Sequence, residues 1–146
     1  VCSISHNGGV QMIVSYFRTL FINTPSIYAD IVERITPLAL PQPPDYPVFP
    51  CIVLSETDHG ETPAKTHEST LTVQLWCASV TSEYGYDMLH RIGDKIRNRL
   101  INHSGSDTYH YIQNVSHKPG GDVEQIADDF SVFILNMDFD VIWEAK

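Results

Sequence analysis

Apolar residues recur every three to four positions in two segments of the chain, and this spacing predicts two main helices. The first expected helix covers residues 10–22 and ends at Asn23, because Pro25 follows and proline cannot continue a helix. A short turn at 26–31 comes after it. The second helix is expected at about 82–102, where apolar side chains repeat every four positions: Tyr84, Met88, Ile92, Ile96 and Leu100.

Alternation of apolar and polar residues predicts the strands, because successive side chains of a strand point to opposite faces of a sheet. The clearest example is 68–78, where Leu71, Val73, Leu75 and Cys77 alternate with Thr70, Thr72, Gln74 and Trp76. The other expected strands are 32–36, 51–56, 108–116 and 130–143.

The remaining segments are rich in residues that break regular structure. Residues 37–50 contain six prolines, which fix the backbone and lack a donor, so an extended, stiff connector is expected. Residues 57–67 are polar and predict a long hairpin loop, and residues 117–128 predict a second loop with an acidic tip. Residues 1–9 end in two glycines and are expected to form a flexible arm.

The resulting order α–β–β–β–α–β–β is typical of an α+β domain. We expect a mixed, mostly antiparallel sheet of about four to five strands, with the two main helices packed on one face. A chain of 146 residues suits a single domain, which we place at residues 10–146 after the N-terminal arm at 1–9.

The formal net charge of −9 argues against nucleic acid and anionic membranes as binding partners. A protein that reads nucleic acid needs a basic patch to displace counterions, and docking on an anionic membrane needs one too. No apolar run reaches the roughly 18 residues that span a bilayer, so we expect no membrane partner. An acidic wall would still allow DNA to pass without sticking, because it repels phosphate.

The sequence carries little that points to catalysis or to a cofactor. The common phosphate-binding, hydrolase and zinc-protease motifs are absent. The seven histidines lack the close spacing of metal ligands, so no metal site is expected. Cys2, Cys51 and Cys77 are odd in number and are expected to be reduced thiols. Asp138 and Asp140 share a strand face and could act as paired carboxylates, but solvated positions are the simpler interpretation.

Several short motifs occur in the order found in one protein family. They are Arg34-Ile35 with Pro37, the Leu40–Gln42 triplet, the proline-rich approach to Cys51, and the strand TLTVQLW that leads into the second helix. From about residue 10 onward the chain resembles the tail-completion, or tail-terminator, proteins of long-tailed, siphovirus-like phages. The resemblance rests on the order and spacing of the motifs.

This resemblance implies a structural and non-enzymatic role in the virion, for a protein made in the host cytoplasm. Members of the family form a hexameric ring on the head-proximal end of the tail tube. The expected partners are therefore further copies of the chain, the tail tube protein and the head–tail connector proteins, with DNA passing only through the lumen. No cofactor is implied.

Contacts between subunits or between rings are expected at charged positions. Loop 57–67 is expected to reach an adjacent ring, and Arg34 or the basic face of the second helix is expected to meet an acidic patch on a neighbour. The candidate contact residues are Arg34, Asp58, His59, Glu61, Lys65, Arg91, Lys95, Arg99, Asp122 and Glu124.

Other functions remain open at this point. The longer N-terminal arm and the larger loop at 117–128 depart from the family pattern, which keeps a head-completion or neck connector protein of the same virion as the alternative. A small cytoplasmic hydrolase that uses Asp138, Asp140 and a histidine, and a small-ligand binding domain, are the remaining hypotheses.

Overall fold

The fold is built on one mixed β-sheet. The computed structural model describes residues 13–37, 48–119, 122–126 and 131–146 of the chain. Seven strands of the described chain join in the order β1-β2-β3-β7-β5-β4, and β6 also pairs with β7. Among these seven described strands, only β1 and β2 run parallel to each other. The strands are β1 (Ile35–Pro37), β2 (Cys51–Glu61), β3 (His67–Ala78), β4 (Gly105–Ser106), β5 (His110–His117), β6 (Val123–Ile126) and β7 (Val132–Ala145).

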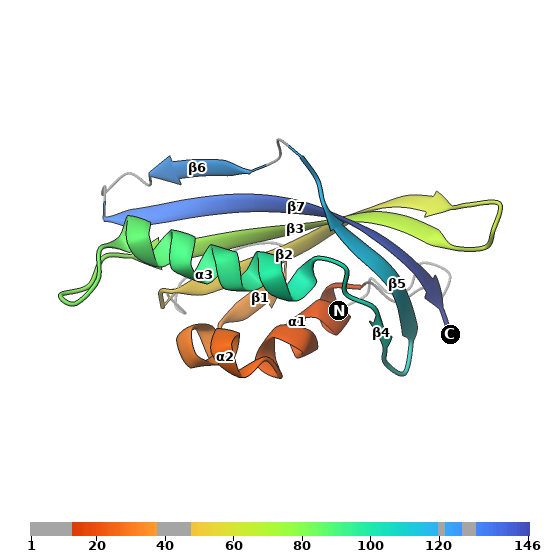
Figure 1. Cartoon of the computed structure of the whole chain (residues 1–146), viewed down its shortest axis with the longest axis horizontal. Helices are drawn as coiled ribbons and strands as arrows, with labels where there is room; N and C mark the ends of the chain where they lie inside the picture. The colour runs from red at the N-terminus through yellow and green to blue at the C-terminus, as the bar shows by residue number, and fades with distance from the viewer. Residues whose placement is uncertain (1–12, 38–47, 120–121, 127–130) are drawn as a thin grey trace.

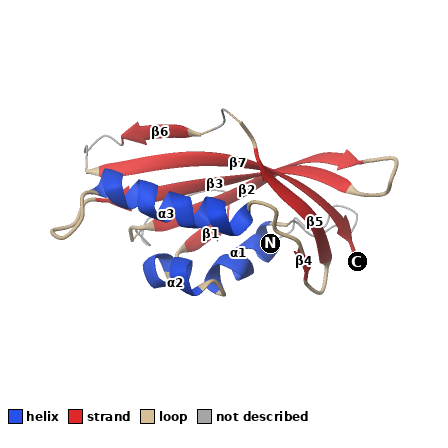
Figure 2. Ribbon diagram, in the orientation of Figure 1, coloured by secondary structure: helices blue, strands red, loops and turns tan. Residues whose placement is uncertain are grey.

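Three helices of the described chain lie on one side of this sheet, as Figures 1 and 2 show. They are α1 (Val14–Ile22), α2 (Pro25–Ile31) and α3 (Gly85–Leu100). The longest, α3, packs closely on the sheet because Gly93 lacks a side chain: a Cβ there would lie 2.9 Å from a methyl carbon of Leu135. A larger residue at this position would push α3 away from β7.

The core lies between the helices and the centre of the sheet. β3 pairs antiparallel with β7 along the whole of β3, so the predicted alternation places the apolar residues of both strands on the same face. Leu71 lies opposite Phe139 and Leu75 lies opposite Leu135 in this register, and all four side chains are buried. The sequence prediction of these two strands and of α3 is therefore confirmed.

The prediction of four to five strands and two main helices is wrong, because the described chain contains seven strands and three helices. The turn expected at 26–31 is the helix α2, which begins at Pro25, where a missing N–H costs nothing. The two missed strands, β4 and β6, are only two and four residues long. β6 is exposed along its whole length, so no apolar alternation marked it in the sequence.

The segment expected to be a loop at 57–67 is mostly strand. β2 continues to Glu61 and β3 begins at His67, and the two strands run beyond the helices as a projecting hairpin (Figure 1). The prediction failed here because both faces of this hairpin carry polar residues. The strand expected at 32–36 corresponds to β1, which begins at Ile35, three residues later than expected. Val32 has a positive φ of 58° directly after α2, so it does not adopt a strand conformation.

Some predicted segments lie outside the described residues. These are the arm at 1–9, the start of the first helix at 10–12, and most of the proline-rich connector, at 38–47. The loop expected at 117–128 is described in part and contains β6.

Candidate functional site

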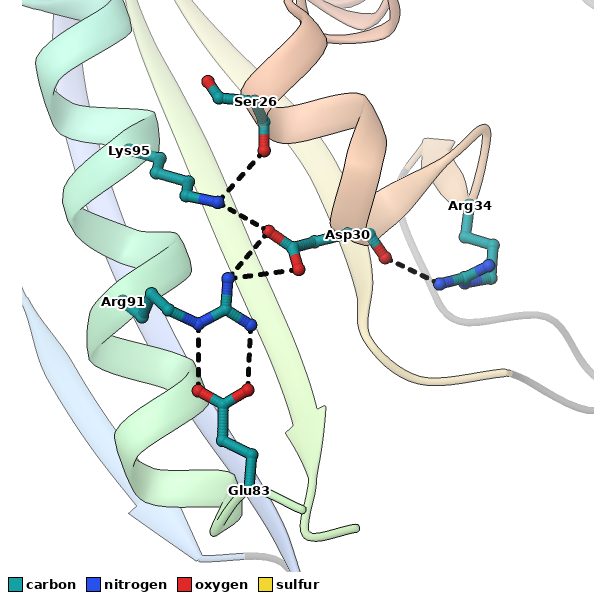
Figure 3. Close-up of polar contacts among 6 residues, drawn as sticks. All are labelled: Ser26, Asp30, Arg34, Glu83, Arg91 and Lys95. Atoms are coloured by element: carbon teal, nitrogen blue, oxygen red, sulfur yellow. Dashed lines mark hydrogen bonds and ion pairs between the residues drawn. The ribbon is translucent and has the colours of Figure 1, made fainter.

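A network of ion pairs joins α2, α3 and the turn before α3 (Figure 3). The guanidinium of Arg91 donates two hydrogen bonds to the carboxylate of Glu83, at 2.9 Å each, and its Nη1 donates to Asp30 at 3.0 and 3.1 Å. Lys95 Nζ donates to Asp30 at 2.9 Å and to the carbonyl oxygen of Ser26 at 3.2 Å. The network therefore fixes α2 against α3.

Asp30 lies at the centre of this network and is held as a carboxylate. Burial pushes the pKa of Asp30 upward, but the hydrogen bonds from Arg91 and Lys95 outweigh this effect, so the pKa lies below its ordinary value. Neither Asp30 nor Glu83 was among the sequence candidates. Asp30 lies on α2, 61 residues from Arg91, and only the packing of α2 on α3 brings these two together. Glu83 lies eight residues before Arg91, in the turn that leads into α3.

Two further basic candidates, Arg34 and Arg99, also bind groups of the same chain. Arg34 donates from Nε to the carbonyl oxygen of Pro50 at 2.9 Å and from Nη2 to that of Asp30 at 2.8 Å. Arg99 donates to Thr24 Oγ1 at 3.1 Å and contacts His103 Nδ1 at 3.1 Å. The basic candidates thus stabilise the layer of helices, and their contact with a neighbouring subunit stays a prediction.

Asp122 and Glu124 connect the segment around β6 to the rest of the domain. Asp122 accepts a hydrogen bond from Arg97 Nη2 and contacts His117 Nε2, both at 2.8 Å. Glu124 lies 3.2 Å from His90 Nε2 on α3. These contacts explain how a fully exposed strand keeps its place beside β7.

The projecting hairpin carries the four remaining candidates. Lys65 and Glu61 form an exposed pair at 3.8 Å in its turn. Asp58 accepts a hydrogen bond from the backbone N–H of Gly60 at 2.9 Å, and His59 Nε2 lies 2.8 Å from Thr70 Oγ1. At the base of the hairpin, His67 stacks on the buried Trp143 with ring centroids 4.5 Å apart. The hairpin therefore has a fixed base and a charged, exposed tip.

The face of the sheet opposite the three helices is polar over β3 and β7. Side chains form cross-strand hydrogen bonds there: Thr72 donates to Asp138 at 2.7 Å, and Gln74 donates to Asn136 at 2.8 Å. Neighbouring positions on this polar sheet face are occupied by Glu68 and Asp140. The two aspartates that the sequence offered as paired carboxylates thus belong to a broad acidic surface.

The groups that the sequence considered for catalysis lie in two places. His59 and Asp140 line one open pocket of about 290 Å³ on the polar sheet face, where His59 Nε2 lies 2.8 Å from Thr70 Oγ1. Burial raises the pKa of the Cys51 thiol to about 11 and that of Cys77 to about 12, and a protonated thiol is a poor nucleophile. Among the described residues, no three potential metal ligands gather in one place.

The described helices are all too short or too polar to cross a lipid bilayer.

Comparison with known proteins identifies the fold but no sequence family. No family profile and no curated protein matches this sequence. A solved chain from a structure described as "Virion of native gene transfer agent (GTA) particle" superposes with a TM-score of 0.70 at 8% sequence identity. The match covers 97% of this chain and 99% of that one. The whole domain therefore shares its fold with a chain from that particle.

Proposed function

We propose that this chain is a structural protein of a phage-like virion. It forms a ring on the head-proximal end of the tail tube, ends tube polymerisation and presents a surface for head–tail joining. The observation that carries this proposal is the fold shared over nearly the full length of a chain from a gene transfer agent virion. The motif order in the sequence favours the tail-terminator role within such a particle.

The projecting hairpin supports a role in contact between rings. Its two strands extend past the helices, and its tip is exposed and charged, with Glu61 and Lys65 in the turn. Such a segment adds little to the core of its own domain, but it can reach a neighbouring ring. In this proposal the hairpin binds the last ring of the tube, and the opposite side of the ring lacks a surface that would accept more tube protein.

The polar sheet face supports an orientation within the ring. Glu68, Asp138 and Asp140 place carboxylates on a surface that the three helices leave free. Facing the lumen, these charges repel the phosphates of DNA and let it slide through. The helices then lie on the outside, where α2 and α3 are fixed together by the Asp30 network.

The experiment that tests this function is electron microscopy of a lysate from a phage that carries a nonsense mutation in this gene. A tail terminator predicts overlong tails beside tailless heads, and a plasmid copy of the gene should restore normal particles. Tails of normal length that fail to join heads would instead assign the protein to the neck, as a connector. Intact, infectious particles would contradict both assignments.

A further inference from the structure

A pocket of about 180 Å³ lies between α1 and the chain around β4. One wall is a face of α1 together with the residue that follows the helix, and the other wall is the end of β4 with the next residue. The lining residues are Tyr16, Thr19, Leu20, Asn23, Ser106 and Asp107. Because a water molecule takes up about 30 Å³ in the liquid, the pocket has room for a small organic molecule.

The hydroxyl end of the Tyr16 side chain lies beside this pocket. A Cβ on Gly105 would lie 2.5 Å from Tyr16 Oη, so glycine leaves the room that the hydroxyl needs. The two residues that follow Gly105 line the pocket. Tyr16 is only 7% exposed, so bulk water has little access to its side chain.

The contacts of His103 determine how the Tyr16 hydroxyl is bonded. Arg99 Nη1 lies 3.1 Å from His103 Nδ1, and a guanidinium can only donate, so Nδ1 is the acceptor. Burial and the charge of Arg99 lower the pKa of His103, which keeps the ring neutral. The single ring proton is therefore on Nε2, and Nε2 donates it to Tyr16 Oη at 2.6 Å.

The proton of the Tyr16 hydroxyl is consequently left without an acceptor among the residues that the structure describes. His103 is the hydrogen-bond partner of this hydroxyl there, and in this contact the imidazole is the donor. Burial and the charge of Asp107 raise the pKa of Tyr16, so the hydroxyl keeps its proton. Since a buried donor without an acceptor is costly, a group that accepts from Tyr16 inside the pocket is stabilising.

Asp107 adds a second requirement, for a donor. Its Oδ1 accepts from the backbone N–H groups of Tyr109 and His110 at 2.8 and 2.7 Å, and lies 3.0 Å from His110 Nδ1. Its Oδ2 has one longer contact, 3.3 Å from His110 Nδ1, and so retains capacity to accept. An anion would be repelled by Asp107, and a simple cation would offer no acceptor to Tyr16.

We propose that this pocket binds a small neutral molecule that bears a carboxamide group. A carboxamide presents an acceptor and a donor side by side: its oxygen accepts the Tyr16 O–H, and its nitrogen donates to Asp107 Oδ2. Leu20 and the methyl group of Thr19 provide an apolar wall for the rest of the molecule. The site does not depend on a ring, so its failure would leave the proposed function untouched.

The test uses benzamide as the probe and the full-length, isotope-labelled chain. In NMR amide spectra, benzamide at millimolar concentration should cause saturable shifts at Leu20, Asn23 and Ser106. Benzoate has nearly the same size and shape but carries a negative charge and no donor, so it should cause no saturable shift. This comparison uses the unmodified protein and depends on no variant.

A pair of variants tests the role of the hydroxyl. Tyr16→Phe keeps the ring and removes the donor, so it should weaken benzamide binding about 3- to 10-fold. Tyr86→Phe removes the hydroxyl of an exposed tyrosine outside the pocket and should bind benzamide as the wild type does. The amide spectrum of each variant shows whether it is folded.

Three results would overturn the inference. They are the absence of saturable shifts with benzamide, equal binding of benzamide and benzoate, and an unchanged affinity for benzamide in folded Tyr16→Phe. If Tyr16→Phe does not fold, the comparison of benzamide with benzoate on the wild type decides.

Discussion

At the scale of single residues, Glu56 shows how a polar group is built into the core side of the sheet. Its position in β2 places it opposite Leu71, on the face that the helices cover. The carboxylate accepts the backbone N–H of Val14 at 3.2 Å, at the start of α1, where N–H groups lack partners within the helix. Burial raises the pKa of Glu56 to about 7, although the N–H groups of Val14 and Ile13 lower it.

This raised pKa predicts that the protein loses stability as the pH rises. The folded state holds the Glu56 proton more tightly than the unfolded chain, so the free energy of unfolding falls between about pH 4.5 and 7. Glu56→Gln keeps the acceptor without the charge and should raise the free energy of unfolding at pH 8 by up to about 3 kcal/mol, with little change at pH 4.5.

Urea denaturation of the wild type and the variant at both pH values measures this difference. Glu61→Gln, which makes the same substitution at a carboxylate in the exposed turn, serves as the control. Equal slopes of stability against pH for Glu56→Gln and wild type would show that Glu56 does not titrate in this range.

A second residue-scale prediction concerns Asp30. Asp30→Ala removes the common partner of Arg91 and Lys95 and should lower the free energy of unfolding by about 1 kcal/mol, because the partners are partly exposed. The loss should shrink in high salt, which screens such pairs. It should also shrink as the pH falls through the lowered pKa of Asp30, where the wild-type carboxylate is protonated and its pairs are lost.

Thermal unfolding in low and high salt provides the measurement for Asp30. The matched control is Asp94→Ala, which breaks the ion pair between Asp94 and Arg97. Because the side chain of Asp94 is 69% exposed, this substitution should change the free energy of unfolding by less than about 0.5 kcal/mol. Equal effects of the two substitutions would contradict a special role for the network.

At the scale of elements, the parts buried on one face were the parts that the sequence predicted. β3, β7 and α3 each carry one apolar face against the core, which leaves a clear period in the sequence. β6 and the outer half of β2 have no such face, so their polar residues suggested loops. The contact of Arg91 with Asp30 could not be predicted, because it depends on how α2 packs against α3.

The hairpin formed by β2 and β3 gives the prediction at this scale. Replacing residues 61–66 with an Asn-Gly turn should leave a shorter hairpin that still closes. The fold should stay intact, because His67 and Ser69, which contact Trp143, are retained. Tail capping should be lost, since the charged tip no longer reaches the tube.

Complementation of the nonsense phage with this variant measures capping directly, and circular dichroism checks the fold. The control is the double substitution Glu61→Gln/Lys65→Gln, which keeps the length of the hairpin and tests whether charge or reach matters. Normal tail lengths with the shortened hairpin would contradict a role for the tip in binding the tube.

At the scale of the whole molecule, the two faces of the sheet differ in chemistry. The helices cover one face of the sheet, and the other is polar with several carboxylates. This division suits the proposed orientation, in which the polar face of the sheet lies toward a lumen. The net charge of −9 fits that proposal, because acidic side chains repel the phosphates of DNA.

The most direct test of this account is a cryo-electron microscopy reconstruction of the head–tail junction in purified particles. The account predicts a single ring of this fold on the last ring of the tail tube, with its hairpins toward the tube and its polar sheet face toward the channel. A junction without this fold, or a ring of this fold elsewhere in the particle, would contradict it.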